Sequence, residues 1–287
     1  MNRSTNRLLA RISKQCLPPL LVHWLTKRFQ QVRYVGNYAN WQQAQAASDG
    51  YDSDLILDRV CQATDKVIAG EAICERDGVA LDQANYPWPV IYALQRTAIE
   101  QPGNSLHVTD FGGSLGSTWR HIAPLLNDQI NLQWSVIEQP HFVAMGQQRY
   151  STDKLHFFTD AQTCHAQHPP QVLLLSGVLP YLPQPYEMLK QLLAMPYSMV
   201  IIDRMMCQKG IEDRLALQHV PKAFYGRKVN YPVWLLSFEK LIKVFEQAGY
   251  TLRFQKNAYI DSSETAHDRY NDQMMIFKKQ SDTTPHA

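Results

Sequence analysis

The pattern of hydrophobic and polar positions changes character near residue 104. Before it, apolar residues recur at helical spacing in two stretches, 55–70 and 90–101, with prolines between them. Asp54 is a plausible N-cap for the first stretch, and Gly70 ends it. We therefore expect residues 1–103 to form a mostly helical region.

Beyond that point, short apolar runs alternate with helical patterns, and the last two runs are joined by a short link. Near-continuous aliphatic strands between helices are typical of a parallel sheet covered on both faces. The sequence predicts a doubly wound, mostly parallel α/β domain over 104–280 that ends in an antiparallel pair, with 281–287 as a flexible tail. The predicted strands are 105–111, 131–138, 154–158, 171–177, 197–203, 251–260 and 272–279.

Residues 204–235 interrupt this alternation, directly after a predicted strand. Carboxyl ends of parallel strands share one edge of the sheet, where open α/β sheets bind ligands. We expect this insertion to cap the substrate at that edge.

Charge is nearly balanced over the whole chain but not along it. The formal net charge is +2, which is too weak to indicate nucleic acid. Before residue 34 there is no acid, and the basic residues are Arg3, Arg7, Arg11, Lys14, Lys27, Arg28 and Arg33. This segment is either a solvated helix or a surface helix that makes peripheral contact with an anionic membrane.

The cysteines, five in number, are scattered and form no CxxC pair. They favour reduced thiols in a cytoplasmic protein over a disulfide framework or a zinc site. The longest apolar run near the start, CLPPLLVHWL, contains two prolines and is too short to span a bilayer.

The stretch HVTDFGGSLGSTWRHI, residues 107–122, runs from a strand through a glycine-rich turn into a helix. Such a turn presents free backbone N–H groups, and Gly112, Gly113 and Gly116 allow a ligand to approach the backbone closely. Glu138 ends the next strand, where a carboxylate can accept hydrogen bonds from both ribose hydroxyls. The turn therefore predicts a nucleoside-containing cofactor.

Two cofactors fit this arrangement. NAD would need helix N–H groups free for a pyrophosphate, but Asp110 stands beside the turn and would repel it. A carboxylate there suits an ammonium or sulfonium charge, and S-adenosylmethionine carries both. Asp110 thus favours S-adenosylmethionine, with an NAD-dependent sugar enzyme as the alternative.

Two further loops extend the predicted cofactor site. Thr159 and Asp160 follow the third strand, where the acid could accept from the adenine amino group or simply cap a helix. Ser176 and Gly177 end the fourth strand, where small residues would let the methionine part lie against the backbone. The predicted cofactor-binding residues are Asp110, Phe111, Gly112, Gly113, Ser114, Gly116, Glu138, Thr159, Asp160, Ser176 and Gly177.

With these motifs, the chain resembles the class I S-adenosylmethionine-dependent methyltransferases. More narrowly, it is similar to a bacterial methyltransferase family associated with surface-polysaccharide biosynthesis, over residue 34 to the end. The stretches that carry the narrower resemblance are 36–52, 70–78, 85–94, 110–117 and 218–237. The resemblance implies a seven-stranded Rossmann-like sheet with an antiparallel last strand, S-adenosylmethionine as cofactor, and transfer to a sugar or other small polar acceptor. It also implies that the helical region 1–103 forms a lid over the cofactor or acceptor.

Transfer to a hydroxyl needs a base, for which we predict His219 with Asp203 as its partner or as the base itself. Local bonding of His219 and pairing of Asp203 with Arg204 is the alternative. A magnesium-assisted route through Asp203 and Asp213 is a further alternative, although no compact carboxylate motif is present, and we predict no metal. The predicted substrate-binding residues of the insertion are Gln218, Tyr225, Arg227 and Tyr231.

A different class of function stays open beside the enzyme. The basic start and the lack of an unmistakable base would also suit a non-catalytic interaction or membrane-docking module on a methyltransferase fold. The sequence carries no signal for the oligomeric state.

Overall fold

The computed structural model describes residues 32–49, 53–221, 229–257 and 270–280 of the 287-residue chain. Seven strands form the main part of one sheet, in the order β6-β5-β4-β7-β8-β12-β11. The neighbours from β6 to β8 pair in parallel, and β12 runs antiparallel to both β8 and β11. These strands are β4 (Ser105–Phe111), β5 (Asn131–Ile137), β6 (Leu155–Phe158), β7 (Val172–Ser176), β8 (Met199–Gln208), β11 (Tyr250–Asn257) and β12 (Tyr270–Lys279). The predicted doubly wound, seven-stranded sheet with a reversed last strand is confirmed.

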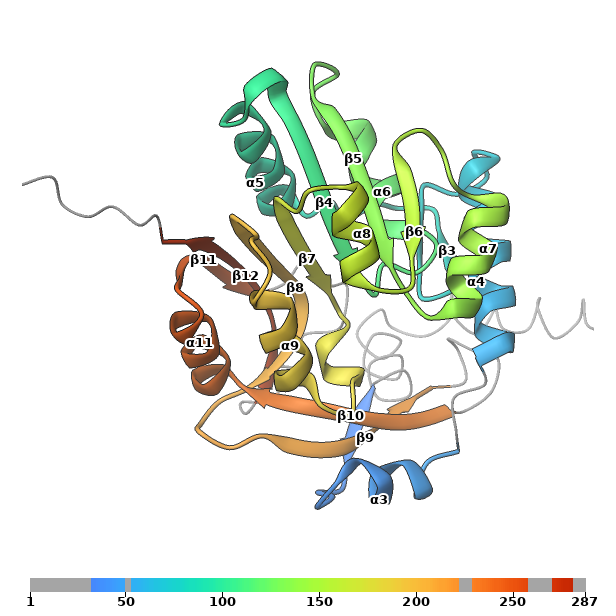
Figure 1. Cartoon of the computed structure of the whole chain (residues 1–287). Coiled ribbons are helices and arrows are strands. Elements are labelled where there is room, and N and C mark those ends of the chain that lie inside the picture. Colours follow the sequence, from blue (N-terminus) through green and yellow to red (C-terminus); the bar gives the residue numbers. More distant parts are fainter. Residues whose placement is uncertain (1–31, 50–52, 222–228, 258–269, 281–287) are drawn as a thin grey trace, which may run out of the picture.

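Helices cover both faces of this sheet (Figure 1). One face packs against α4 (Ser53–Ile68), α5 (Trp88–Ile99), α6 (Ser117–Ile122) and α7 (Pro140–Arg149). The other face packs against α8 (Ala161–Gln167), α9 (Pro185–Leu193) and α11 (Phe238–Gln247). Short 3-10 turns, η1 (Pro102–Asn104), η2 (Ala123–Leu125) and η3 (Leu179–Tyr181), link some of these elements.

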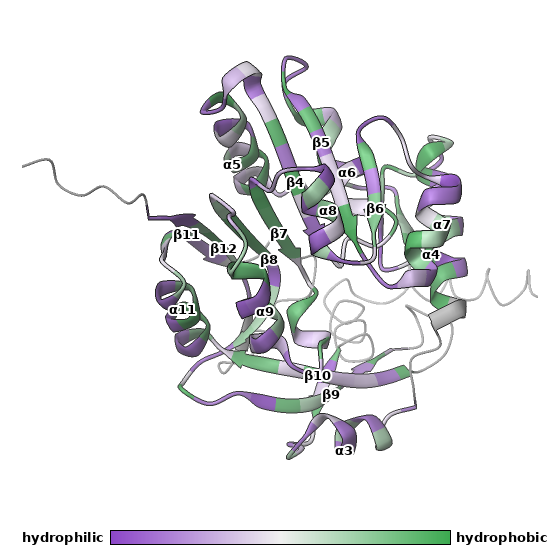
Figure 2. Cartoon of the chain, viewed as in Figure 1, coloured by the Kyte–Doolittle hydropathy of each residue, from purple (hydrophilic) through white to green (hydrophobic). Residues whose placement is uncertain are grey.

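Strand β7 shows how the pleat divides the core. Val172 and Leu174 belong to the cluster under α5, whereas Leu173 and Leu175 belong to the cluster under α9 and α11. Successive side chains of a strand point to opposite faces, so a strand covered on both sides must be apolar throughout. Figure 2 shows this as continuous green on β7, while the outer faces of α9 and α11 are purple.

The predicted insertion 204–235 is largely strand. β8 continues past its predicted end at residue 203 to Gln208, and β9 (Arg214–Val220) and β10 (Val229–Ser237) follow. β10 pairs with β9 and with the end of β8, and β1 (Arg33–Val35) pairs with the far side of β9. These strands lie across the carboxyl ends of β7 and β4 (Figure 1), with α3 (Trp41–Ala46) on their outer side.

The N-terminal region holds strands that the helical prediction lacked. β2 (Cys74–Arg76) and β3 (Val79–Leu81) form a small hairpin, joined by Asp77 and Gly78 with φ of 50° and 76°. Positive φ at both turn residues favours Asp-Gly, which is a hairpin signal. The partner of β1 lies far along the chain, so no local pattern indicates that strand.

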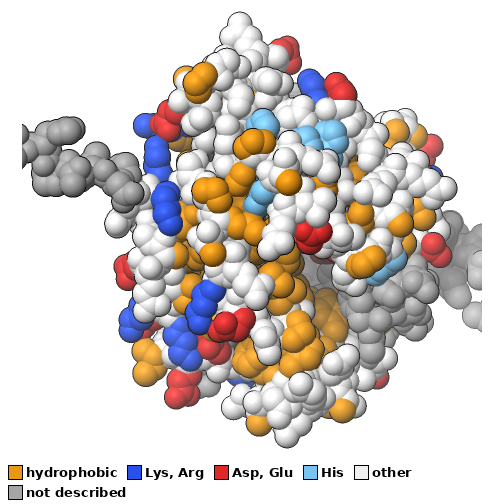
Figure 3. Space-filling view, viewed as in Figure 1, with side chains coloured by type: hydrophobic (Ala, Val, Ile, Leu, Met, Phe, Trp, Pro, Cys, Tyr) orange, Lys and Arg blue, Asp and Glu red, His pale blue; other side chains and the backbone are white. Residues whose placement is uncertain are grey.

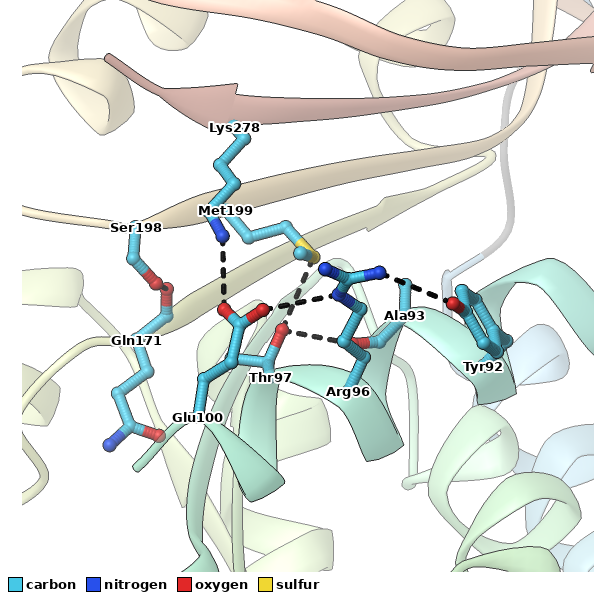
Figure 4. A network of polar contacts seen from close by, with 9 residues as sticks. All are labelled: Tyr92, Ala93, Arg96, Thr97, Glu100, Gln171, Ser198, Met199 and Lys278. Carbon is cyan, nitrogen blue, oxygen red and sulfur yellow. Dashed lines mark hydrogen bonds and ion pairs between the residues drawn. The ribbon is translucent and has the colours of Figure 1, made fainter. Parts of the chain in front are cut away.

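Polar contacts attach α5 to the strands that it covers (Figure 4). Glu100 accepts from Arg96 on its own helix and forms an ion pair with Lys278 of β12 at 2.9 Å. Thr97 donates to the Ala93 carbonyl and to the Met199 sulfur of β8. Over α9 and α11, acidic and basic side chains intermingle on the surface (Figure 3). Among the described residues, no helix has the length and apolarity to cross a membrane.

Gly146 on α7 provides a test of core packing. A Cβ there would lie 2.5 Å from the ring of Phe157, which is almost fully buried in β6. Gly146→Ala gains about 1 kcal/mol in helix propensity. Overpacking of a buried ring costs about 1–3 kcal/mol. We therefore expect a net loss of stability in urea unfolding. The matched control, Gln148→Ala on an exposed position of the same helix, should not lose stability; an equal gain in both variants would contradict this packing.

Candidate functional site

The glycine-rich turn leaves β4 and leads into α6. Gly112, Ser114 and Gly116 all have left-handed backbone, with φ of 75°, 55° and 84°. The Gly112 N–H donates to the carbonyl of Ile137 at the end of β5. The turn is therefore fixed to the carboxyl edge of the sheet between two central strands.

The protein's own packing explains two of the glycines. A Cβ on Gly112 would lie 2.5 Å from Val178, and one on Gly113 would lie 2.5 Å from the Asp110 carboxyl group. From the sequence, we predicted that these glycines leave the backbone accessible to a ligand. In the structure, Gly112 makes room for the loop after β7, and Gly113 lies directly on the Asp110 side chain.

Asp110 points into the core, not into a cleft. It is fully buried, its Oδ2 accepts from the Trp134 indole N–H at 3.1 Å, and its Oδ1 has no partner. Burial raises the pKa of this carboxyl to about 7, against the lowering effects of Trp134 and Arg204. Asp110 therefore supports the turn from beneath, and a ligand in contact with its carboxylate has no path to it in this conformation.

Glu138 follows β5 and lies beside the turn. Its Oε2 accepts from the Gln139 N–H at 2.7 Å. Burial raises the pKa of Glu138, while backbone hydrogen bonding from Gln139 and Ser114 lowers it. The side chain is half-buried. Glu138 is thus the acid that the structure places at the surface of the glycine turn.

The end of β7 lies next to this turn and pairs with the middle of β8. Ser176 pairs with Asp203 in register, its Oγ donates to Asp203 Oδ2 at 3.3 Å, and the Gly177 N–H donates to the Asp203 carbonyl. Burial raises the pKa of Asp203, and Arg204 and Ser176 oppose that rise. A half-buried carboxyl with a raised pKa, beside the end of a central strand, has the properties of a general base.

The β2–β3 hairpin reaches the start of α6. Ser117 Oγ donates to Glu75 Oε2, and the Gly78 N–H donates to Glu75 Oε1 at 2.8 Å. Glu75 is buried, and burial raises its pKa, with Ser117 opposing the rise. The N-terminal region therefore contacts the glycine turn directly, through a residue outside the predicted site.

The predicted adenine-side residues make only local contacts. Asp160 caps α8, with Oδ1 accepting from the Thr163 N–H at 2.8 Å, and both Thr159 and Asp160 are exposed. The same helix cap lowers the pKa of Asp160. Phe111 packs between α8 and the second core cluster.

Strand β9 separates two predicted residues onto opposite faces. Leu215 and Leu217 pack against Ala44 of α3, and alternation places His219 on the same face. Gln218 lies on the other face, where its Oε1 accepts from the Tyr181 hydroxyl at 2.9 Å. The Tyr181 ring also contacts that of Tyr231 on β10. No contact among the described residues joins His219 to Asp203.

Asp213 has a structural role. Its carboxylate accepts from the Tyr186 hydroxyl and the Ser237 N–H, and it pairs with Lys240 at 3.0 Å. It therefore orders the start of α11 and is not joined to Asp203. Within the described part of the chain, no three His, Cys, Asp or Glu side chains are arranged to hold a metal ion. The predicted residues Tyr225 and Arg227, and the basic segment before residue 32, lie outside the described residues.

The sequence analysis did not predict two residues at this edge, Arg204 and Tyr181, as part of the site. Arg204 follows Asp203, where it was considered only as an ion-pair partner, and Tyr181 lies in η3 after β7. The signal available for both was position, because each comes within a few residues of the carboxyl end of a central strand.

No protein-family model matches the chain, and no curated protein sequence matches it. Solved structures with a similar fold include the N-terminal domain of EvdMO1 with SAH and D-fucose: 12% identity over 80% of this chain and 98% of that chain, with a TM-score of 0.44. Magnesium protoporphyrin IX methyltransferase from Synechocystis, with bound SAM, is 12% identical over 81% of this chain and 100% of its own, with a TM-score of 0.42. CalS10, an amino pentose methyltransferase from Micromonospora echinaspora, is 10% identical over 67% and 89%, with a TM-score of 0.41. Because these TM-scores lie under 0.5, the fold assignment rests on the strand order itself.

The buried Asp110 makes the stability of the fold depend on pH. Its pKa in the folded state is about 7 and exceeds its ordinary value of 3.8, so the folded state releases this proton at a higher pH than the unfolded chain does. The contribution is therefore lost as pH rises through this window, by up to about 4 kcal/mol. Asp110→Asn cannot ionise, so its stability relative to the wild type should increase between pH 4 and pH 8 in urea unfolding.

Asp128→Asn, at an exposed position, serves as the control and should follow the wild-type pH profile. Parallel profiles for wild type and Asp110→Asn would mean that Asp110 is not buried as described.

Proposed function

We propose that the chain is an S-adenosylmethionine-dependent methyltransferase that methylates a small polar acceptor, a sugar in glycan biosynthesis being the acceptor that the resemblance favours. The observation that carries the proposal is the position of Glu138, half-buried at the end of β5 and hydrogen-bonded to the glycine turn after β4. In a doubly wound sheet, an acid at this place accepts hydrogen bonds from a ribose.

The residues at the carboxyl edge suit the three parts of the donor. Glu138 would take the ribose hydroxyls, and the exposed loop of Thr159 and Asp160 would take the adenine amino group. Ser176 and Gly177 would line the methionine part. Gly177 has left-handed backbone with φ of 66°, a conformation that favours glycine. The loop after β7 therefore has no side chain at this position. Asp110 acts indirectly, by holding the shape of the turn.

When bound, the donor supplies a methyl group on a sulfonium, which an acceptor displaces in line. The chain's contribution is positioning and the removal of a proton. Asp203 is the better base of the predicted pair, because burial raises its pKa and its carboxyl lies beside Ser176 at the end of β7. His219 lies on the face that packs towards α3.

The acceptor side lies between η3 and the β9–β10 hairpin. Tyr181, Gln218 and Tyr231 bring a hydroxyl, an amide and two rings together there. Gln218 and Tyr231 were predicted as substrate-binding residues, and we retain that role for them. A few polar groups among aromatic side chains are typical of sites for small polar molecules.

The proposal predicts that the full chain binds S-adenosylhomocysteine with saturable heat in titration calorimetry. Glu138→Gln keeps the size of the side chain but loses its charge. Loss of charged hydrogen bonds costs about 1.5–3 kcal/mol, so affinity should fall about tenfold to a hundredfold.

Glu246→Gln, at an exposed position of α11, is the matched control and should bind like the wild type. Absence of heat at millimolar ligand with wild-type protein would overturn the proposal. Equal affinity of Glu138→Gln and wild type for S-adenosylhomocysteine would contradict the role of Glu138 in binding the ribose.

A further inference from the structure

Strand β8 changes partners halfway along, and Arg204 lies at the change. On one side, β8 pairs with β7 up to Asp203 and with β10 from Cys207. No described strand pairs with β8 on this side between those two contacts. Arg204 therefore lies at the point where the strand pairing passes from β7 to β10.

A bulge brings both Asp203 and Arg204 to this edge. The register of β12 against β8 shifts between Gln273 and Met275, so that these two residues stand opposite Met274 alone. Arg204 has left-handed backbone with φ of 54°, a conformation that is costly for a long side chain. Bulges of this kind occur next to active sites, where they redirect a side chain.

The guanidinium of Arg204 lacks a hydrogen-bonded carboxylate. Its Nε donates to Ser176 Oγ at 3.2 Å, and the nearest paired carboxylate oxygen, Asp203 Oδ2, lies 3.9 Å from Nε. No hydrogen bond or ion pair of the described residues engages Nη1 or Nη2. Four N–H donors of a side chain that is only 23% exposed are thus left for a ligand or water.

Acidic side chains surround this cation, but none of the described ones forms a hydrogen bond with it. Burial lowers the pKa of Arg204, but Asp77, Asp203, Tyr181 and Glu75 act in the opposite direction and the result is a raised pKa. Burial also raises the pKa values of Asp203 and Glu75, which weakens both as counterions. A half-buried guanidinium in this state gains most from an anion that it can bind with two parallel hydrogen bonds.

We infer that Arg204 binds a carboxylate or phosphate group of the acceptor, and so selects an anionic substrate. This inference rests on the proposed function. Arg204 follows Asp203, the proposed base, and interacts electrostatically with Tyr181 of the acceptor side. The donor's own carboxylate is the other source of the same chemistry, and the experiment separates the two.

The test titrates inorganic phosphate into the full chain saturated with S-adenosylhomocysteine, at constant ionic strength maintained with chloride, and follows the thermal unfolding midpoint. The wild-type midpoint should rise saturably with phosphate. Arg204→Asn, chosen because Asn tolerates left-handed backbone, should weaken phosphate binding at least tenfold, and Arg204→Lys should restore part of it. Arg253→Asn, on an exposed position of β11, is the control and should respond like the wild type.

Affinity for S-adenosylhomocysteine should change less than twofold in Arg204→Asn. A tenfold loss, with unchanged affinity for 5′-methylthioadenosine, which lacks the carboxylate, would assign Arg204 to the donor and overturn the inference. A wild-type midpoint that does not respond to phosphate, or an equal response in Arg204→Asn, would also overturn it. If wild type fails to bind S-adenosylhomocysteine, the proposed function falls, and the phosphate titration without it still decides whether Arg204 binds an anion.

Discussion

Burial of the central strands on both faces is the constraint from which the rest of the molecule follows. β7 and the first part of β8 have helices on each side, so every side chain from Val172 to Leu175 and from Met199 to Ile202 is apolar. Polar side chains then follow these apolar stretches, at Ser176 and Asp203. The parallel arrangement brings Glu138, Ser176 and Asp203 to the same edge of the sheet, although they are far apart in sequence.

Asp110 is an acid buried among these apolar side chains, and its burial costs free energy. It lies one residue before the end of β4, on the face that packs against the first helix layer, and only one of its oxygens is hydrogen-bonded. A neutral carboxyl avoids most of the cost of burying a charge. Its position under Gly113 links the core to the loop above it, so the shape of the turn depends on the protonation and packing of one buried side chain.

The main sheet could be predicted from sequence because each strand carries its own signal. Continuous aliphatic runs such as that of β7 indicate two covered faces whatever their partners are. The strands β1, β9 and β10 give no such signal, because polar residues interrupt their apolar runs and because β1 and β9 pair across a long stretch of sequence. The residues at strand ends were predictable for the same reason as the strands, whereas Glu75 enters the site from a hairpin whose destination no local pattern encodes. The direction of a side chain was also beyond the sequence. Asp110 was predicted on its strand but points into the core, and His219 was predicted in a capping insertion but lies on β9, whose alternation puts it on the α3 side.

The ten-residue β8 has two successive partners on one side: it pairs first with β7 and then with β10. Its first half is committed to the apolar interior, while its second half supports a hairpin that contributes little to that interior. Descendants of such a chain can therefore exchange or lengthen the hairpin with few consequences for the half of β8 that pairs with β7. A strand shared in this way lets the hairpin change during evolution while the main sheet stays the same.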